Sequence, residues 1–191
     1  MAVRVLAAHK RKKIQAYQHL INEAQIEGIG QGDNNALERL YRSTVQAVYA
    51  YILSIIRNPA DTPKLVEETY VWVRKSAHLY TPTGKPLAWI FSIALKLAQD
   101  YCQPYASQPE RGSKMDLEPS LERISTKIDR VIFRCALRVL SSEERQVLFL
   151  YSMAGLRYWE ISTNLSLHIL TVYIRHKSSI YKLTRHLEKR G

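Results

Sequence analysis

The sequence predicts an all-α protein in which two helical domains are joined by a flexible linker, the second a four-helix domain with a helix-turn-helix. Apolar residues recur at steps of three and four along most of the chain, which is the period of an amphipathic helix. Glycine and proline fall between these stretches, where helices end. From Gln103 to about Ser120 the pattern lapses, and a structureless run of this length predicts an interdomain linker. We therefore expect an extension over residues 1–20, domains over 21–103 and 121–191, and a linker over 104–120.

Positive charge is concentrated at the two ends of the chain. The 191 residues carry a formal net charge of +11. Residues 1–19 hold five basic and no acidic residues, residues 128–191 hold eleven basic and five acidic ones, and the middle is balanced. This pattern suggests a polyanionic partner. The basic run His9-Lys10-Arg11-Lys12-Lys13 is either a solubilising tail or a nonspecific contact to phosphates.

Several classes of function are disfavoured by the sequence. Cys102 and Cys135 form no disulfide framework and no zinc motif. There is no glycine-rich phosphate loop, nucleophile elbow or paired carboxylate motif, so we expect neither an enzyme nor a cofactor. No apolar run is long enough to span a bilayer, and we expect a cytoplasmic protein without membrane insertion. The histidines lie on different expected elements and predict no metal site: His9, His19, His78, His168, His176 and His186.

The first domain is expected to contain three longer helices after a short helical stretch that fades at Gly28, Gly30 and Gly32. Residues 35–57 carry a broad apolar stripe, which Asn58-Pro59 ends. Asp61 is the expected cap of the next helix, which has Pro63 in its first turn and runs to about His78. Val71 and Trp72 on this helix are either a partner surface or scattered surface residues.

A loop over residues 80–85 precedes a third helix that Pro86 opens. Aromatic and basic groups together suit unstacked bases, because a ring stacks on a base while lysine meets phosphate. Equally, a tryptophan on a helix often belongs to the core. The residues that can gather on this exposed side are Lys85, Trp89, Lys96 and Gln99.

The second domain is expected to end in a helix-turn-helix. Its first helical face begins near Leu121 and continues through Ile124, Ile128, Val131, Ile132, Cys135 and Val139. Ser141 and Glu144 form a capping box for a helix that Gly155 closes. A short helix with Ile161 and Leu165 then meets the break Ser166-Leu167-His168. The longer helix that follows fits a DNA major groove, although an ordinary helical hairpin with a solvated basic face is the alternative. Its outward face would carry Leu170, Ile174, Lys177, Ser178, Tyr181 and Arg185.

The order of these elements resembles a bacterial extracytoplasmic-function sigma factor of the minimal two-domain kind. The resemblance covers roughly residues 21–189 and rests on four stretches. These are ALERLYRSTVQAVYAYILSIIRNPADTPKLVEETYVWVRKSAHLY, GKPLAWIFSIALKLAQDY, ALRVLSSEERQVLFLYSMAGLRYWEISTNLSL and the recognition helix.

The resemblance implies three sets of contacts. Binding to core RNA polymerase would involve Leu65, Glu67, Glu68, Tyr70, Val71 and Arg74. The minus-ten promoter element would be melted and held by Tyr80, Lys85, Trp89, Lys96 and Gln99. The minus-thirty-five element of promoter DNA would be read by Leu170, Thr171, Tyr173, Ile174, Arg175, Lys177 and Ser178. An anti-sigma factor is a usual further partner in the family.

Several positions depart from the family pattern, among them three that bear on DNA binding. Arg157 stands where a serine or threonine usually caps the first helix of the motif, which should cost about 1 kcal/mol. Leu170 and Ile174 occupy outward positions that are usually small or polar, and they suit either thymine methyl groups or a protein partner. The hypotheses are therefore an alternative sigma factor, a dimeric helix-turn-helix regulator, or a divergent sigma-like protein that works mainly through protein contacts.

Overall fold

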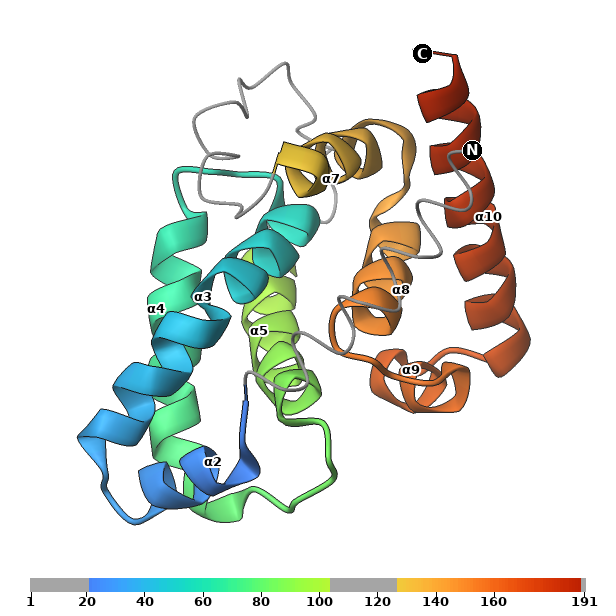
Figure 1. Cartoon of the computed structure of the whole chain (residues 1–191). Coiled ribbons are helices and arrows are strands. Elements are labelled where there is room, and N and C mark those ends of the chain that lie inside the picture. Colours follow the sequence, from blue (N-terminus) through green and yellow to red (C-terminus); the bar gives the residue numbers. More distant parts are fainter. Residues whose placement is uncertain (1–20, 104–126, 190–191) are drawn as a thin grey trace.

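The protein is built from helices arranged in two halves that lie side by side. The computed structural model describes residues 21–103 and 127–189, and contains no β-strand within those ranges (Figure 1). The first half contains α2 (Glu23–Gly30), α3 (Asn34–Ile56), α4 (Thr62–Ser76), the short 3-10 helix η1 (Ala77–Leu79) and α5 (Pro86–Cys102). The second half contains α7 (Lys127–Val139), α8 (Ser142–Ser152), α9 (Tyr158–Leu165) and α10 (Ile169–Glu188). The predicted all-α fold class is confirmed.

The first half is a bundle in which α3, α4 and α5 pack pairwise on one another. Its core is formed by apolar side chains of all three helices, with Leu40, Ile52 and Ile90 completely buried. The rings of Tyr51 and Phe91 stack between α3 and α5, with centroids 4.3 Å apart. This packing explains why α3 is apolar over so broad a stripe, since two helices cover it.

The helix ends of the first half agree with the sequence predictions at α2 and differ from them at α4. The helix α2 ends at Gly30, within the run of glycines where the pattern fades. A Cβ at Gly30 would lie 3.2 Å from the backbone of His78, so this glycine permits close packing on η1. Asp61 precedes α4 as expected, but its side chain makes no capping hydrogen bond. Its carboxylate instead accepts a hydrogen bond of 2.6 Å from the hydroxyl of Tyr101, which ties α4 to the end of α5.

In the second half, α8 and α10 pack on each other, and α7 also contacts α10. The helix α7 buries two apolar sides, where the sequence predicted one. Cys135 and Ala136 join the cluster around Leu183 of α10, whereas Phe133 and Leu137 join the core that continues into the first half. Val131, an expected core residue, is 43% exposed. The expected start of this domain and the linker lie outside the described residues, as does the basic extension.

The two halves share a continuous apolar core, and polar contacts cross the boundary. The helices α3 and α8 are in contact, and residues of both halves belong to one buried cluster. Arg145 of α8 is almost fully buried at 1% exposure. Its Nε donates to the carbonyl oxygen of Ser54 in α3 at 2.7 Å. A buried guanidinium that binds a backbone carbonyl of the other half fixes how the halves meet.

None of the helices in residues 21–103 and 127–189 is long and apolar enough to cross a membrane.

Candidate nucleic-acid interface

The helix-turn-helix predicted from the sequence is formed by α9 and α10. Ser166 ends α9 in the left-handed conformation, with φ 52°. The amide of Leu167 donates to the carbonyl oxygen of Ser162 at 3.0 Å, which closes the turn. His168 then caps α10 by accepting a hydrogen bond from the amide of Leu170. The turn residues therefore orient α10 as the second helix of the motif.

The inner face of α10 is held in place by apolar and aromatic contacts. Val172 and Leu183 are buried, as is His176. The ring Nδ1 of His176 lies 2.9 Å from the hydroxyl of Tyr158 on α9. The His176 ring also packs on Tyr151 of α8, with centroids 4.3 Å apart. His176 is thus a buried structural residue that joins α10 to α8 and α9.

The outer face of α10 begins with apolar groups and continues with basic and aromatic ones. Leu170 and Ile174 are each 56% exposed, and they lie one helical turn apart. Between them is Tyr173, and the ammonium of Lys177 lies 5.5 Å from the centre of its ring. Tyr181 is exposed further along the helix. The N-terminal part of this face, before Tyr181, has the position from which a recognition helix contacts base edges in a helix-turn-helix.

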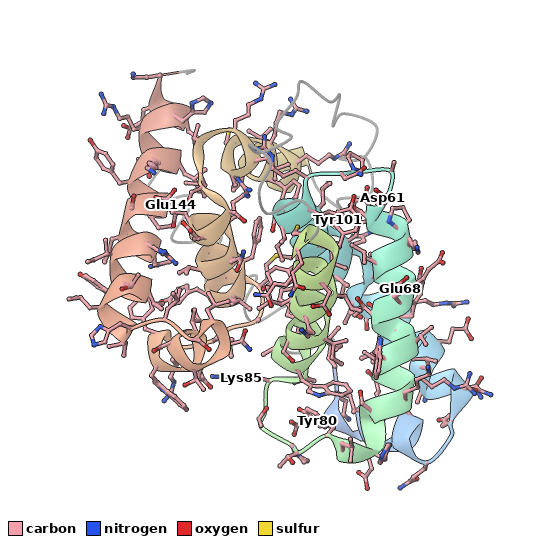
Figure 2. The ribbon with its side chains drawn as sticks, turned by 180° about the vertical axis from the view of Figure 1, so that it is seen from behind. Asp61, Glu68, Tyr80, Lys85, Tyr101 and Glu144 are labelled. Atoms are coloured by element: carbon pink, nitrogen blue, oxygen red, sulfur yellow. The ribbon has the colours of Figure 1, made fainter. Side chains whose placement is uncertain are left out.

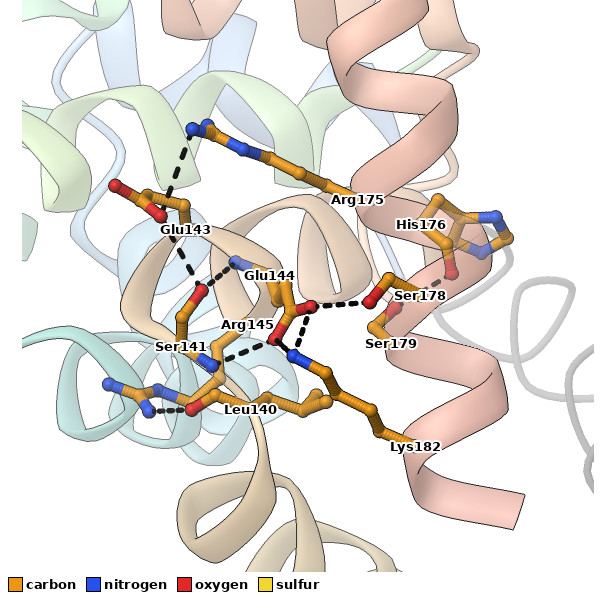
Figure 3. A network of polar contacts seen from close by, with 10 residues as sticks. All are labelled: Leu140, Ser141, Glu143, Glu144, Arg145, Arg175, His176, Ser178, Ser179 and Lys182. Atoms are coloured by element: carbon orange, nitrogen blue, oxygen red, sulfur yellow. Dashed lines mark hydrogen bonds and ion pairs between the residues drawn. The ribbon is translucent and has the colours of Figure 1, made fainter. Parts of the chain in front are cut away.

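Some of the predicted base-reading residues are engaged within the protein itself (Figure 3). The hydroxyl of Ser178 donates to a carboxylate oxygen of Glu144 at 2.7 Å, and Lys182 binds the same carboxylate. The guanidinium of Arg175 lies 3.7 Å from Glu143, and its side chain is 26% exposed. Of the residues predicted to read the minus-thirty-five element, Ser178 and Arg175 are therefore turned toward α8. The more exposed members are Leu170, Tyr173, Ile174 and Lys177, with Thr171 partly exposed.

Glu144 caps α8, as the sequence predicts, and has a second structural role that the sequence did not predict. The predicted capping box is present, because the amide of Ser141 donates to its carboxylate and the Ser141 hydroxyl accepts from its amide. Burial raises the pKa of Glu144, but Lys182, the Ser141 amide and Ser178 lower it more, so the pKa lies below its usual value. The carboxylate therefore fixes α10 on α8. No local sequence pattern pairs Glu144 with a residue 38 positions away.

Arg157 occupies the cap position of α9 without a side-chain capping bond, as the sequence led us to expect. Glu160 compensates in part, because its carboxylate accepts a hydrogen bond of 2.6 Å from the amide of Arg157. The same carboxylate pairs with Lys85 at the start of α5. Burial raises the pKa of Glu160, whereas Lys85 and Arg157 lower it to a value below the usual one. One acidic residue thus supports the first turn of α9 and joins the two halves.

In the first half, the structure brings two of the predicted minus-ten residues together. The rings of Tyr80 and Trp89 have centroids 5.0 Å apart, and both pack against the edge of the core. The Tyr80 hydroxyl donates to Glu23 at 2.7 Å. Figure 2 shows Tyr80 and Lys85 at the two ends of the loop that leads into α5. The remaining two residues of this set lie further along α5: Lys96, which pairs with Asp100, and Gln99, which is exposed.

Glu23 holds this loop in a single conformation. Its Oε1 accepts hydrogen bonds from the Tyr80 hydroxyl and from the amides of Thr83 and Gly84. These bonds, led by the one from Tyr80, lower the pKa of the Glu23 carboxyl. Gly84 has a φ of 73°, which its lack of a side chain permits. The sequence carried no signal for Glu23, because its partners are about 60 residues away.

The predicted polymerase-binding set divides between core and surface. Leu65 and Tyr70 are buried, so their side chains support α4 from beneath and are not part of its surface. The hydroxyl of Tyr70 bonds to Thr44 of α3 at 2.6 Å, and burial raises the pKa of this tyrosine. Trp72, which was outside the predicted set, is 50% exposed. With it on the outer face of α4 are Glu67, Glu68, Val71 and Arg74.

Together, these features define a two-part helical protein with an aromatic-basic loop and helix in its first half and a helix-turn-helix in its second. Within the described residues no group of three or more histidine, cysteine, aspartate or glutamate side chains could hold a metal ion.

Comparison with known proteins agrees with this description. No family model matches the chain. It is 25% identical over 161 residues to the ECF RNA polymerase sigma factor SigK of Mycobacterium sp. (strain KMS), covering 80% of this chain and 83% of that protein. It is 26% identical over 174 residues to SigK of Mycobacterium ulcerans (strain Agy99), covering 86% of this chain and 92% of that protein. The SigK of Mycobacterium tuberculosis (strain ATCC 25177 / H37Ra) is 24% identical over 87% of this chain and 93% of its own length.

A solved structure shares the fold. CnrH, determined in complex with the cytosolic domain of CnrY, matches with a TM-score of 0.60 and 19% sequence identity. The match covers 88% of this chain and 98% of CnrH. The chain is a homologue of the ECF RNA polymerase sigma factors over most of its length, which confirms the resemblance found in the sequence.

Proposed function

We propose that this protein is an alternative sigma factor that binds core RNA polymerase and directs promoter-specific initiation of transcription. The observation that supports the proposal is that one chain carries two exposed surfaces, each suited to a different form of DNA. The helix α10 presents an exposed face suited to duplex DNA, and the loop before α5 presents aromatic and basic groups suited to unpaired bases. The homology to ECF sigma factors over at least 80% of the chain supports the same conclusion.

The two surfaces would act on different parts of a promoter. The outer face of α10 would occupy the major groove of the minus-thirty-five element, with Lys177 meeting phosphates or base edges. Tyr80 and Trp89 would stack on bases of the melted minus-ten strand, which contributes about 1–3 kcal/mol per base. Because each contact is weak alone, joining both on one chain raises the affinity for DNA that carries both elements.

Polymerase binding is assigned to the outer face of α4. Val71 and Trp72 are each 50% exposed there, next to the charged groups of Glu67, Glu68 and Arg74. An exposed apolar pair within a charged surface is typical of a protein interface. In this arrangement the buried Leu65 and Tyr70 hold α4 in place from the core side.

The proposal is tested by transcription with purified components. The full chain is mixed with bacterial core polymerase and a genomic promoter library, and transcripts are mapped. The expected result is discrete start sites that share two spaced motifs. A variant with Val71→Ala and Arg74→Ala should lose polymerase binding, whereas Gln46→Ala on the exposed side of α3 should not. Binding of duplex DNA without any effect on polymerase would reject the proposal in favour of a polymerase-independent regulator.

A further inference from the structure

The exposed apolar residues at the start of α10 are unusual for a helix that enters a DNA groove. Leu170 and Ile174 are each 56% exposed, and Tyr173 is 44% exposed. They occupy the N-terminal half of the helix, which is the part that contacts base edges in a helix-turn-helix. The opposite side, with Val172 and His176, is buried against α8 and α9. The apolar groups are therefore directed away from the protein's own core.

The side chains on this helix that could form hydrogen bonds to bases are partly engaged elsewhere. Ser178 donates to Glu144 at 2.7 Å, and Lys182 binds the same carboxylate at 2.7 Å. Arg175 is directed to Glu143. Arginine, lysine, asparagine and glutamine are the usual readers of guanine and adenine. Of these types, the exposed N-terminal part of the face carries Lys177, whose ammonium lies over the ring of Tyr173. Recognition of the DNA sequence by α10 must then depend largely on apolar contacts to the bases.

Thymine is the base that offers an apolar group in the major groove, namely its C5 methyl. Leucine and isoleucine side chains can pack on this methyl but can form no hydrogen bond to any base. Residues four apart on a helix are separated by about 6 Å along its axis. Base pairs are stacked at about 3.4 Å, so the two side chains can reach methyl groups roughly two steps apart.

The charge of the helix favours DNA over a second copy of the chain as the occupant of this surface. The helix α10 contains four lysine or arginine residues, Arg175, Lys177, Lys182 and Arg185, and one acidic residue, Glu188. Lys177 lies within the apolar surface, over the ring of Tyr173. Arg175 and Lys182 are paired with Glu143 and Glu144, which leaves Lys177 and Arg185 as the basic groups directed outward. Two copies that met through this face would bring these like charges together, whereas phosphates of DNA would pair with them.

We propose that Leu170 and Ile174 determine promoter specificity by packing on thymine methyl groups in the upstream element. The inference rests on the part of the proposed function that places α10 in duplex DNA. The inference adds to the proposed function which bases α10 recognises. The upstream element must carry thymines about two base-pair steps apart, on either strand.

The test removes one methyl group at a time from the DNA and one side chain at a time from the protein. Duplexes are first selected with the full chain and with its polymerase complex. Each thymine of the selected element is then replaced by deoxyuridine, which lacks only the methyl. The unaltered protein should bind the deoxyuridine duplex about three- to tenfold more weakly at the positions that matter. Leu170→Ala and Ile174→Ala should each abolish this discrimination at one of them.

Tyr181→Ala is the matched control, because Tyr181 is an exposed apolar residue of the same helix at 64% exposure. It lies about 16 Å from Leu170 along the helix axis, so thymine and deoxyuridine should still be distinguished as before. All three positions are exposed, and these substitutions should leave the thermal unfolding of the protein nearly unchanged.

The outcomes separate this inference from the proposed function. If start sites appear but no deoxyuridine substitution weakens binding, the inference is wrong and the sigma activity stands. If the protein does not bind polymerase, but its affinity for duplex DNA depends on the thymine methyl groups, the inference about Leu170 and Ile174 stands and the sigma activity is rejected. Loss of a dimer on Leu170→Ala, measured by sedimentation, would show a protein interface and overturn the inference. Failure of the full chain to bind any duplex would overturn both.

Discussion

Lys85 at the start of α5 and Glu160 in the first turn of α9 form an ion pair that joins the two halves of the protein, although 75 residues separate them in the sequence. The two side chains are only 18% and 19% exposed. Figure 2 shows Lys85 directed from α5 toward the second half. Lys85 is also one of the residues that the family resemblance predicts to contact the minus-ten strand. The Glu160 carboxylate and a DNA phosphate would therefore compete for the same ammonium group.

Replacement of Glu160 by glutamine tests this competition. Glutamine can still accept the hydrogen bond from the Arg157 amide, but it lacks the charge that holds Lys85. The polymerase complex of Glu160→Gln should bind single-stranded minus-ten DNA about two- to fivefold more tightly, measured by fluorescence anisotropy. Glu188→Gln, an exposed change on the same half, is the control. Unchanged affinity in Glu160→Gln would show that Lys85 does not meet the strand.

Most of the helices could be predicted because their signals are local. The apolar period, Pro63 and Pro86 near helix starts, and the Ser141–Glu144 capping box all act within a few residues. The turn at Ser166 was found although the usual glycine is absent, since the periodic pattern stops there and resumes. Asp61 was mistaken for a side-chain cap because its partner Tyr101 is 40 residues away. Local patterns cannot reveal such partners.

The candidate site was less predictable for the same reason. Periodicity gave the outer face of α10, but it could not show that Glu144 binds Ser178 and Lys182. On α4, an apolar residue in a helical pattern can face the core or a partner. Leu65 and Tyr70 prove to be core residues, whereas Trp72 is half exposed. The choice depends on which helices pack around α4, and this is a property of the tertiary fold.

Two tyrosines of the first core should respond in opposite ways to the loss of a hydroxyl. The Tyr51 hydroxyl is buried and has no hydrogen-bond partner in the described part of the chain, while that of Tyr70 bonds to Thr44. Tyr51→Phe removes an unsatisfied polar group and should raise the free energy of unfolding by about 1 kcal/mol. Tyr70→Phe should lower it by about 1 kcal/mol. Urea unfolding of both variants measures the difference, and a decrease for Tyr51→Phe would contradict the prediction.

Acid should weaken the fold through its paired carboxylates. Lys182, the Ser141 amide and Ser178 hold the pKa of Glu144 below its usual value in the folded protein, and the pKa values of Glu160 and Glu23 are lowered as well. A carboxyl with a lowered pKa binds fewer protons when folded than when unfolded. Its contribution to stability is complete above about pH 5.5 and is lost as the pH falls through the folded pKa.

The free energy of unfolding should accordingly be level from pH 7 to about pH 5.5 and should fall below about pH 4.5. Glu144→Gln should lower the free energy of unfolding at pH 7. It should also reduce the fall of that free energy with pH in acid, because glutamine has no charge to lose. Glu27→Gln, on the exposed side of α2, should change neither the free energy of unfolding at pH 7 nor its dependence on pH in acid. Urea midpoints at several pH values provide the measurement, and an equal acid slope in Glu144→Gln would show that another group is responsible.

Trp89 and Trp72 should have separable effects on initiation, since they lie on different helices and differ in exposure. Trp89 is partly buried beside Tyr80 at the start of α5, and Trp72 is half exposed on α4. Trp89→Leu keeps an apolar side chain for the core but removes the ring on which a base can stack. With polymerase in excess, it should slow promoter opening by about tenfold or more, followed with 2-aminopurine in the minus-ten element.

Trp72→Leu should instead weaken polymerase binding and leave opening unchanged once polymerase saturates the protein. Thermal unfolding must show that both variants fold, because Trp89 packs against the core. If the two variants impair the same step, the proposal that α4 binds polymerase while α5 acts in promoter opening is wrong. If Trp89→Leu opens promoters at the normal rate, the aromatic pair with Tyr80 serves only to support the loop that Glu23 already holds.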